Sequence, residues 1–373
     1  MSRAIRTICL LGFLSWQTAA LLAVQDDGWR TAEPGWQYSF PRDHGPHHEF
    51  KTEWWYATGN LVDDADDPKT KEQGYGFQLT FFRQGIRPGK KPESASRFRV
   101  TELPFAHFTF TDVHERTFKF TQKSSRGAFG EAGFAKPPGR IAWMDDWLLE
   151  MDEYGRFHLK ASGEGRSVDL LLTPDREPLI HGEKGISQKS ATPGHASHYY
   201  SLTRLQASGT VSINGNMHPV HGLVWFDHEW ASNSLAHDEA GWDWSGLHLS
   251  NAEDLMIFRI RDAAKREVFH SGTLCEANGT THNIKDLELT PVGTWKSPHT
   301  GGLYPASWHL RIPSRRLELT IVPKLADQEL VLPPFAYWEG AIKANGTNQD
   351  QPIQAEGYFE MTGYGGRILG LSQ

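Results

Sequence analysis

Cysteine is nearly absent from this chain, which excludes a small fold cross-linked by several disulfide bonds. The 373 residues include only Cys9 and Cys275, so removal of a leader that carries Cys9 would leave one thiol without an intramolecular partner. Basic residues are not in excess either, because the net charge is −7, and a general nucleic-acid-binding face is not expected. The folded chain must therefore be held together by the packing of its core.

Sequence signatures of several common enzyme classes are also missing. There is no GxSxG nucleophile elbow, no glycine fingerprint for phosphates or dinucleotides, no HExxH and no CxxC. These absences argue against a serine hydrolase of the usual type and against a nucleotide-dependent enzyme.

The N-terminal residues have the pattern of a secretion signal. Arg3 and Arg6 precede an apolar run from Ile8 to Val24, and polar sequence begins at Gln25. A basic start, a short apolar segment and small residues near its end are typical of a cleaved signal peptide. The sequence predicts a signal over residues 1–24 and export to the periplasm or the exterior. The alternative is an uncleaved membrane anchor, for which the run is short.

Aromatic residues and turn formers dominate the remaining composition. The chain has 14 Trp, 20 Phe, 36 Gly and 21 Pro, and helical periodicity is almost absent. Short apolar runs such as Tyr75–Phe82 and Leu255–Ile260 are bounded by turn residues. The dipeptides Asn214-Gly215, Asn278-Gly279 and Asn345-Gly346 are typical of hairpin turns. This pattern predicts an all-β protein built from sandwiches or barrels.

Weak internal repeats indicate two related domains. Four pairs of stretches recur in the same order, with loop-length differences between them: Glu53–Leu61 with Gly241–Leu249, Phe77–Arg83 with Leu255–Arg261, Tyr200–Gly209 with Tyr337–Gly346, and Trp225–Asp227 with Tyr358–Glu360. We interpret them as an internal duplication, with β domains over residues 30–235 and 236–373. The first domain carries a long polar segment, His181–His198, which is either a binding loop or a simple insertion.

The region from Trp225 to Trp244 combines acidic, imidazole and indole side chains at the domain junction. Successive side chains of a strand point to opposite faces. Alternation therefore separates Asp227 and Glu229 from Phe226, His228 and Trp230, and it separates Trp242 and Trp244 from Asp243.

Both a catalytic and a structural interpretation fit this region. A carboxyl group among indole rings is desolvated, so its pKa should rise toward the working pH. A neighbouring imidazole can relay a proton, and aromatic faces can stabilise a developing cation. In the structural alternative, the tryptophans are core residues and the Asp–His pair is a satisfied polar contact.

A second cluster of histidines and carboxylates lies between Asp43 and Glu53. His44, His47 and His48 are candidate ligands of zinc or another transition metal, but their spacing matches no closed metal template. We therefore predict no metal site and expect His44 and His47 in a solvated or hydrogen-bonded loop. Next to the tryptophan pair Trp54-Trp55, His48 and Glu53 are expected to line a ligand cavity.

The spaced motifs of this chain resemble those of one protein family. The stretches concerned are His47–Leu61, Gly76–Arg83, Tyr199–Val211, Phe226–Trp230, Gly241–Leu249 and Tyr337–Gly346. They resemble the AttH-like family, which is similar to the carotenoid 1,2-hydratases and is also labelled as predicted secreted hydrolase. The resemblance implies two tandem lipocalin-like β-barrels packed side by side, with an apolar ligand cavity. A barrel of about eight strands can hold one small ligand.

The resemblance also implies a chemistry. The hydratase relatives add water to an isolated carbon–carbon double bond without a cofactor, through protonation of the alkene, a tertiary cation and attack by water. A His-x-Trp pair is implicated in those relatives, and His228-Glu229-Trp230 matches it here. Their proposed acid belongs to a Tyr-x-Asp pair that has no counterpart in this chain. Asp243, or Asp227 in its place, is then the candidate acid.

Three functions follow as hypotheses. In the first, an exported lyase hydrates an isoprenoid or other apolar alkene, with Asp243 as acid, His228 orienting the water or the acid, and aromatic walls from Trp54, Trp55, Trp230, Trp242 and Trp244. In the second, the chain carries a lipid or another apolar molecule, alongside an ABC-type transporter. In the third, a carboxylate–His pair activates water for hydrolysis. The oligomeric state is not determined by the sequence.

Overall fold

The fold was analysed in a computed structural model that describes residues 28–66, 74–88, 100–233, 235–236 and 238–366. The predicted signal over residues 1–24 lies outside the described residues. Regular structure in the described part is strand apart from three short 3₁₀ turns, Arg42–His44, Ala128–Gly130 and Pro313–Arg315. The expected all-β class is thus confirmed. No described helix is long and apolar enough to cross a membrane.

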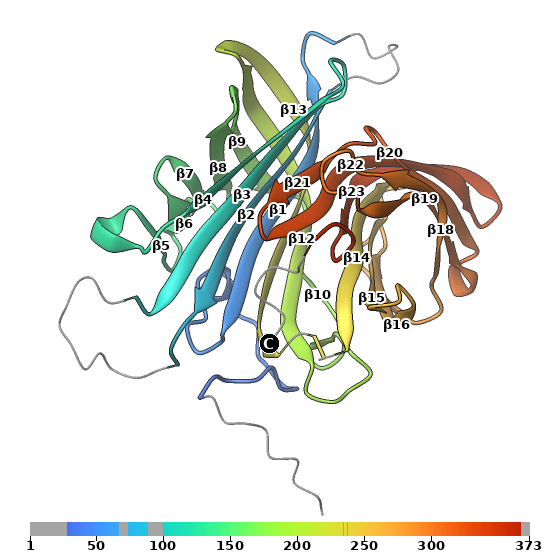
Figure 1. The fold of residues 1–373 in the computed structure, drawn as a ribbon, viewed down its shortest axis with the longest axis horizontal. Coiled ribbons are helices and arrows are strands. Elements are labelled where there is room, and N and C mark those ends of the chain that lie inside the picture. Colours follow the sequence, from blue (N-terminus) through green and yellow to red (C-terminus); the bar gives the residue numbers. More distant parts are fainter. Residues whose placement is uncertain (1–27, 67–73, 89–99, 234, 237, 367–373) are drawn as a thin grey trace, which may run out of the picture.

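The first sheet is antiparallel and curls around its own core (Figure 1). Its spatial order runs from β4 through β3, β2, β1, β13, β12, β9, β8, β7 and β6 to β5, with β10 and β11 beside β12. The bounds are β1 (Thr52–Asp63), β2 (Tyr75–Gly85), β3 (Glu102–Asp112), β4 (Thr117–Ser124), β5 (Ala132–Phe134), β6 (Gly139–Met144), β7 (Trp147–Met151), β8 (Phe157–Gly163), β9 (Arg166–Pro174), β10 (Leu179–Ile180), β11 (Ser187–Gln188), β12 (Ala196–Ile213) and β13 (Asn216–Asn233).

The second sheet lies beside the first and curls in a similar way (Figure 1). Its order is β17, β16, β15, β14, β23, β22, β20, β19 and β18, with β21 beside β22. The bounds are β14 (Glu239–Leu249), β15 (Asp254–Asp262), β16 (Glu267–Cys275), β17 (Thr281–Ile284), β18 (Glu288–Lys296), β19 (Leu303–Ile312), β20 (Leu317–Pro323), β21 (Glu329–Leu332), β22 (Phe335–Asn348) and β23 (Gln351–Met361).

The two sheets share one strand order, as a repeat predicts. From β3 to β9 the first sheet runs β3, β2, β1, β13, β12, β9, and the second runs β16, β15, β14, β23, β22, β20. Trp55 pairs with His228 on β1 and β13, while Asp243 pairs with Met361 on β14 and β23. These four residues therefore occupy corresponding positions in the two sheets. The duplication itself stays a prediction.

The register corrects one sequence alignment by a single residue. Tyr200 pairs with His228 and Trp338 pairs with Met361, so Tyr200 corresponds to Trp338 rather than to Tyr337. A β-bulge between Leu202 and Leu205 causes the difference, because it adds a residue to β12.

Two of the three predicted Asn-Gly turns are confirmed, and one is wrong. Asn214 and Gly215 have φ of 51° and 89° and form the two-residue turn between β12 and β13. Asn278-Gly279 lies in the turn between β16 and β17. Asn345-Gly346 lies inside β22, where a Cβ on Gly346 would come within 1.8 Å of the Glu318 carbonyl oxygen. That glycine permits a close approach of strands rather than a turn.

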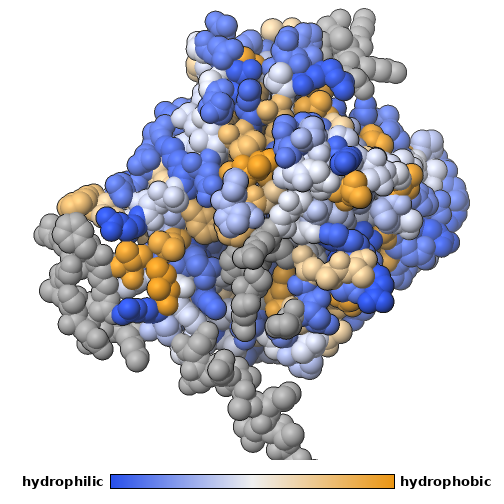
Figure 2. Space-filling model, viewed as in Figure 1, coloured by the Kyte–Doolittle hydropathy of each residue, from blue (hydrophilic) through white to orange (hydrophobic). Residues whose placement is uncertain are grey.

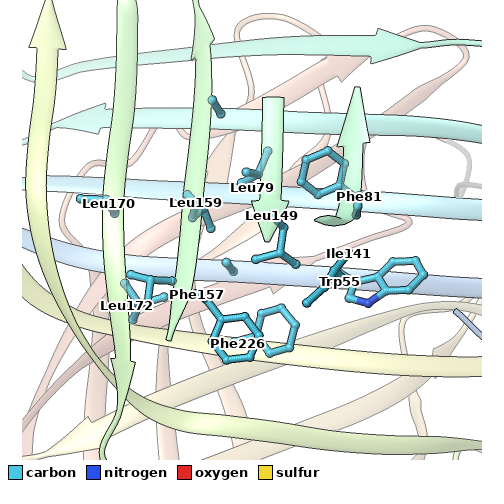
Figure 3. Packing of buried hydrophobic residues seen from close by; sticks show 14 of the residues in the cluster. Trp55, Leu79, Phe81, Ile141, Leu149, Phe157, Leu159, Leu170, Leu172 and Phe226 are labelled. Carbon is cyan, nitrogen blue, oxygen red and sulfur yellow. The ribbon is translucent and has the colours of Figure 1, made fainter. Parts of the chain in front are cut away.

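A large aromatic and aliphatic core fills the curled first sheet. Figure 3 shows the strands that carry Leu149, Leu159 and Leu170 crossing over those that carry Trp55 and Leu79. Trp55, Leu159 and Leu170 are at most 1% exposed, and burial of side chains of this kind stabilises a fold by about 1.5–3 kcal/mol each. A separate core that includes Trp308, Leu310 and Phe359 fills the second sheet.

A third apolar cluster joins the outer faces of the two sheets. It combines Tyr56, Tyr199 and Trp225 from the first sheet with Trp244 and Phe258 from the second. On the face shown in Figure 2 the surface is mostly hydrophilic and apolar side chains lie in scattered groups. The extensive apolar packing is therefore found within the sheets and between them.

An ion-pair cluster also crosses between the sheets. Asp254 on β15 is fully buried and accepts hydrogen bonds from Arg176 Nη1 at 2.9 Å and Arg204 Nη2 at 2.7 Å, both from the first sheet's part of the chain. His248 Nδ1 lies 3.0 Å from the same carboxylate. The buried charge is thus fully partnered, and it depends on both halves being in contact.

We predict that Asp254→Asn lowers the free energy of unfolding by about 3 kcal/mol, because two half-buried guanidinium groups lose their buried counterion. Urea unfolding monitored by tryptophan fluorescence measures this. The control is Asp350→Asn, which breaks an exposed pair with Arg316 and should change the free energy by less than about 0.5 kcal/mol. Equal effects of the two substitutions would contradict the role of the cluster.

Candidate functional site

A cavity opens between the outer faces of the two sheets. Its walls come from β1, β2, β3, β12 and β13 on one side and β14, β15, β22 and β23 on the other. Most of its lining residues are aromatic or acidic, and the lining includes Trp54, Tyr56, Phe82, Phe105, His107, Lys189, Tyr199, Asp227, Glu229, Trp242, Trp244, Phe258, Tyr337, Glu339 and Glu360, with Glu53 and Arg83 and several uncharged polar and aliphatic side chains also bordering it. Such a combination of apolar walls and a few polar groups is typical of a small-molecule site.

Side-chain alternation places the predicted residues as expected from the sequence. Asp227 and Glu229 line the cavity, whereas His228 and Trp230 point into the first sheet's interior. On β14, Trp242 and Trp244 line the cavity, and Asp243 does not. The region from Trp225 to Trp244 therefore divides between the cavity and the two sheet interiors.

Asp227 is a buried carboxyl group surrounded by neutral donors. Tyr199 Oη donates to Oδ2 at 2.7 Å and Trp225 Nε1 donates to Oδ1 at 2.6 Å, while the Ser201 hydroxyl also donates to Oδ1. Burial raises the pKa of Asp227 to about 7, although these hydrogen bonds oppose the shift. Asp227 can thus exchange a proton near neutral pH.

Two further cavity acids, Glu339 and Glu360, come from the second sheet. They face each other across β22 and β23. Trp242 Nε1 donates to Glu360 Oε2 at 2.8 Å, and burial raises the pKa of Glu360 to about 7. Burial and the neighbouring Glu360 raise the pKa of Glu339 well above its usual range. Tyr56 Oη donates to Glu339 Oε1 at 2.7 Å across the interface between the sheets. The other carboxylate oxygen of Glu339, Oε2, is buried and has no hydrogen-bond partner in the described structure.

Sequence reasoning missed Glu339 and Glu360, although the repeat contained a signal for one of them. Glu360 occupies the position of Asp227, since Trp225–Asp227 and Tyr358–Glu360 are matching stretches. Glu339 corresponds instead to Ser201, because Asp227 pairs with Ser201 and Glu360 pairs with Glu339. The sequence alignment could have identified Glu360 as an acid, but no motif distinguishes Glu339.

The long polar segment between His181 and His198 contributes one cation to the cavity wall. Lys189 Nζ lies 2.9 Å from Glu229 Oε1 and 4.5 Å from the ring centres of Tyr199 and Phe258. His181 bridges the sheets, with Nε2 2.6 Å from Ser201 Oγ and Nδ1 3.0 Å from Thr273 Oγ1. This segment is therefore part of the wall, and its lysine is already paired with Glu229.

Asp243 does not occupy the position that its candidate role as acid requires. It points into the second sheet's interior, where Arg259 Nε and Arg261 Nε donate to Oδ2 at 2.7 Å and 2.9 Å. Tyr364 Oη lies 3.3 Å from the same oxygen. The carboxylate of Asp243 forms ion pairs with two guanidinium groups. It does not line the cavity, so it cannot reach a ligand there.

His228 and Glu53 belong to a buried network inside the first sheet. His228 Nε2 and His47 Nδ1 lie 2.9 Å and 2.7 Å from Glu53 Oε1, and Arg83 Nε donates to Oε2 at 3.0 Å. Burial raises the pKa of Glu53, but His47, His228 and Arg83 outweigh it and hold that pKa well below its usual range. Burial lowers the pKa of His228.

The remaining predicted residues are divided between this interior and the surface. Trp55 and Trp230 are buried beside His228 with ring centres 4.6 Å and 4.9 Å away, and neither lines the cavity. Of the two alternatives expected for His44 and His47, the hydrogen-bonded one holds, because both side chains are buried and hydrogen-bonded. The expected cavity position of His48 is wrong, because its exposed side chain pairs with Glu102 at 3.1 Å.

Comparison with known proteins identifies the relatives of this fold. Residues 31–364 match the model of the AttH-like family. The chain is similar to a solved structure from Nitrosomonas europaea assigned to AttH, with a TM-score of 0.78 and 32% identity over 90% of this chain and 99% of that one. Kievitone hydratase from Nectria haematococca aligns with a TM-score of 0.67 and 15% identity, covering 91% and 98% of the two chains.

CghA is a further structural neighbour, with a TM-score of 0.53 and 10% identity over 91% of this chain and 97% of that one. A search of curated proteins gave no match. The family model and the 32% identical structure both span most of the chain, so the predicted family is confirmed. This protein belongs to the AttH-like family.

Proposed function

We propose that this protein is a cofactor-independent hydro-lyase that adds water to, or removes it from, a small apolar alkene in the cavity between the sheets. The observation that carries the proposal is a set of buried and half-buried carboxyl groups with raised pKa values that line the same cavity as several aromatic side chains. A carboxylic acid whose pKa lies near neutrality can donate a proton to carbon and recover it afterwards. The fold shared with kievitone hydratase supports a reaction of this class.

Glu360 is the proposed proton donor. One of its oxygens is fixed by the Trp242 indole, and its side chain is part of the cavity wall. Proton transfer from Glu360 to one alkene carbon forms a C–H bond and leaves a cation on the other carbon. The indole faces of Trp54, Trp242 and Trp244 would stabilise that cation.

Asp227 is the proposed base for the water molecule. It approaches the cavity from the opposite sheet and is held in place by Tyr199 and Trp225. When water attacks the cation, a C–O bond forms and the departing proton passes to the Asp227 carboxylate. Proton exchange with solvent then restores Glu360 and Asp227, and dehydration follows the same steps in reverse.

The location and partners of the protein are part of the proposal. The N-terminal pattern over residues 1–24 supports export, and the apolar walls of the cavity support a terpenoid-like or lipid-like molecule.

A carrier function is the second candidate, because aromatic walls alone suffice to hold an apolar molecule. An ABC-type transporter would then exchange that molecule with the protein. The carrier needs no acid, whereas Glu339 is buried and Glu360 is half-buried at a cost in free energy that ligand binding alone does not explain. The hydro-lyase is therefore the favoured function.

We predict that Glu360→Gln lowers kcat at least about 100-fold, because the amide cannot donate its proton to carbon. Turnover is measured on a panel of terpenoid alkenes in heavy-oxygen water, with mass spectrometry of the alcohols formed. The matched control is Glu356→Gln on the same strand, which is exposed and should keep the wild-type rate. A wild-type protein that incorporates no label into any alkene, yet co-purifies with an apolar molecule, supports the carrier instead.

We also predict a defined pH dependence. Glu360 must be protonated to donate, and its pKa is raised to about 7. Asp227 must be ionised to accept the proton of water, and its pKa is also raised to about 7. The rate of hydration should therefore pass through a maximum near pH 7 and fall by up to tenfold per unit on either side of it. Initial rates between pH 5 and pH 9 measure this dependence. A rate that rises across pH 7 to 8 would contradict Glu360 as the acid.

A further inference from the structure

The geometry points to a second site: His47, His228 and Glu53 form a buried binding site for a divalent transition-metal ion of the zinc class. The site lies inside the first sheet, on the face of β13 opposite to the cavity. One ligand atom from each side chain lies within 4.8 Å of the other two, and all three residues are buried. Two imidazoles and one carboxylate are a ligand set that zinc uses in proteins.

The hydrogen bonds of His228 direct its Nε2 atom at Glu53. Its Nδ1 lies 2.9 Å from the carbonyl oxygen of Asp43, which can only accept, so Nδ1 carries the hydrogen. In the neutral ring Nε2 then carries a lone pair, and that lone pair faces a carboxylate oxygen of Glu53 at 2.9 Å. A positive centre, either a proton or a metal ion, must lie between two acceptors at this distance. A metal ion bound to both atoms would take the place of the proton.

In each of the two histidines, the ring nitrogen that faces away from Glu53 lies near an oxygen atom of Asp43. This arrangement is usual for metal-binding histidines. His228 Nδ1 donates to the Asp43 carbonyl, and His47 Nε2 lies 3.4 Å from Asp43 Oδ1. Metal-binding histidines almost always donate their other ring N–H to a carbonyl or carboxylate, which fixes the tautomer and the ring orientation. One residue, Asp43, provides both acceptors here, and its side chain is itself held by Arg42.

Aromatic stacking and Arg83 hold the three ligands in place. Trp230 stacks on His47 with ring centres 3.8 Å apart, and Trp55 stacks on His228 at 4.6 Å. Arg83 Nε binds the Oε2 atom of Glu53 at 3.0 Å and leaves Oε1 directed at both histidines. Two imidazole nitrogens therefore converge on one firmly held carboxylate oxygen, which preorganises the three ligand atoms.

Metal binding needs only a small opening of this cluster. Zinc–nitrogen and zinc–oxygen bonds are about 2.0–2.1 Å long, so ligand atoms of a tetrahedral site lie about 3.3 Å apart. Glu53 Oε1 is now 2.7 Å and 2.9 Å from the two nitrogens. The side chains would thus separate by about half an ångström. No fourth ligand side chain joins the group among the described residues, so a water molecule would complete the coordination.

The test is metal uptake by the full-length protein after treatment with a chelator. We expect one equivalent of Zn²⁺ in calorimetry, and one equivalent of Co²⁺ with the intense visible absorption of a tetrahedral site. Titrations in buffers of different ionisation enthalpy should show proton release, since ligands must be deprotonated to bind. Uptake of less than a tenth of an equivalent by the wild-type protein would overturn the proposal.

Substitutions locate the ion. His228→Gln and Glu53→Gln should each weaken Zn²⁺ binding at least about 100-fold, and Asp43→Asn about 10-fold to 100-fold, because it removes a partner of a ligand. The matched control is His248→Gln, from a histidine–carboxylate–arginine cluster that lacks a second histidine. Wild-type affinity in His228→Gln, with a wild-type circular dichroism spectrum, would place any bound metal elsewhere and refute the site.

The wild-type uptake measurement does not depend on whether a variant folds. If hydrogen bonds alone hold His47, His228 and Glu53 together, the wild-type protein takes up no metal and its unfolding midpoint does not change on addition of Zn²⁺. That result would refute the proposal. If the site exists, the midpoint rises with the Zn²⁺ concentration in the wild type and in His248→Gln.

Discussion

Where the two sheets meet, the central strands β1, β13, β14 and β23 are buried on both faces, and the alternation of their side chains decides what each residue can do. One face of each strand belongs to the interior of its own sheet, and the other belongs to the cavity between the sheets. A shift of one residue along β13 moves a side chain from one environment to the other. Asp227 and His228 are neighbours in sequence, yet they belong to different sites.

The three buried environments differ mainly in how their charges are balanced. Inside the first sheet, Glu53 is paired with Arg83, and inside the second, Asp243 is paired with Arg259 and Arg261. Of the cations that border the cavity, Lys189 is paired with Glu229 and Arg83 with Glu53.

The other cavity acids have mainly neutral donors such as Tyr56, Tyr199 and Trp242. A carboxyl group partnered by neutral donors keeps its proton to a higher pH than one beside a guanidinium group. This difference explains why proton chemistry fits the space between the sheets better than either interior.

The sequence predicted the class of fold and the local direction of side chains well, because both depend on short-range patterns. Alternation around Trp225 and Trp242 gave the correct faces, and Asn214-Gly215 gave a correct turn. The role of Asp243 failed because its two arginines lie on another strand, beyond the reach of any local pattern. Glu339 was missed for the same reason, since only the pairing of β22 with β23 and the docking of Tyr56 make it an interior acid.

The hydrogen bonds from Tyr56 to Glu339 and from Trp244 to Tyr199 cross from one sheet to the other. The acid strength of the cavity is therefore not a property of either half of the chain. In an isolated half these carboxyl groups would meet water and titrate like ordinary surface acids. Each half has a hydrophobic core of its own, but the cavity and its acids exist only where the two halves are in contact. The pKa values of the cavity carboxyl groups would therefore show whether the two halves are docked.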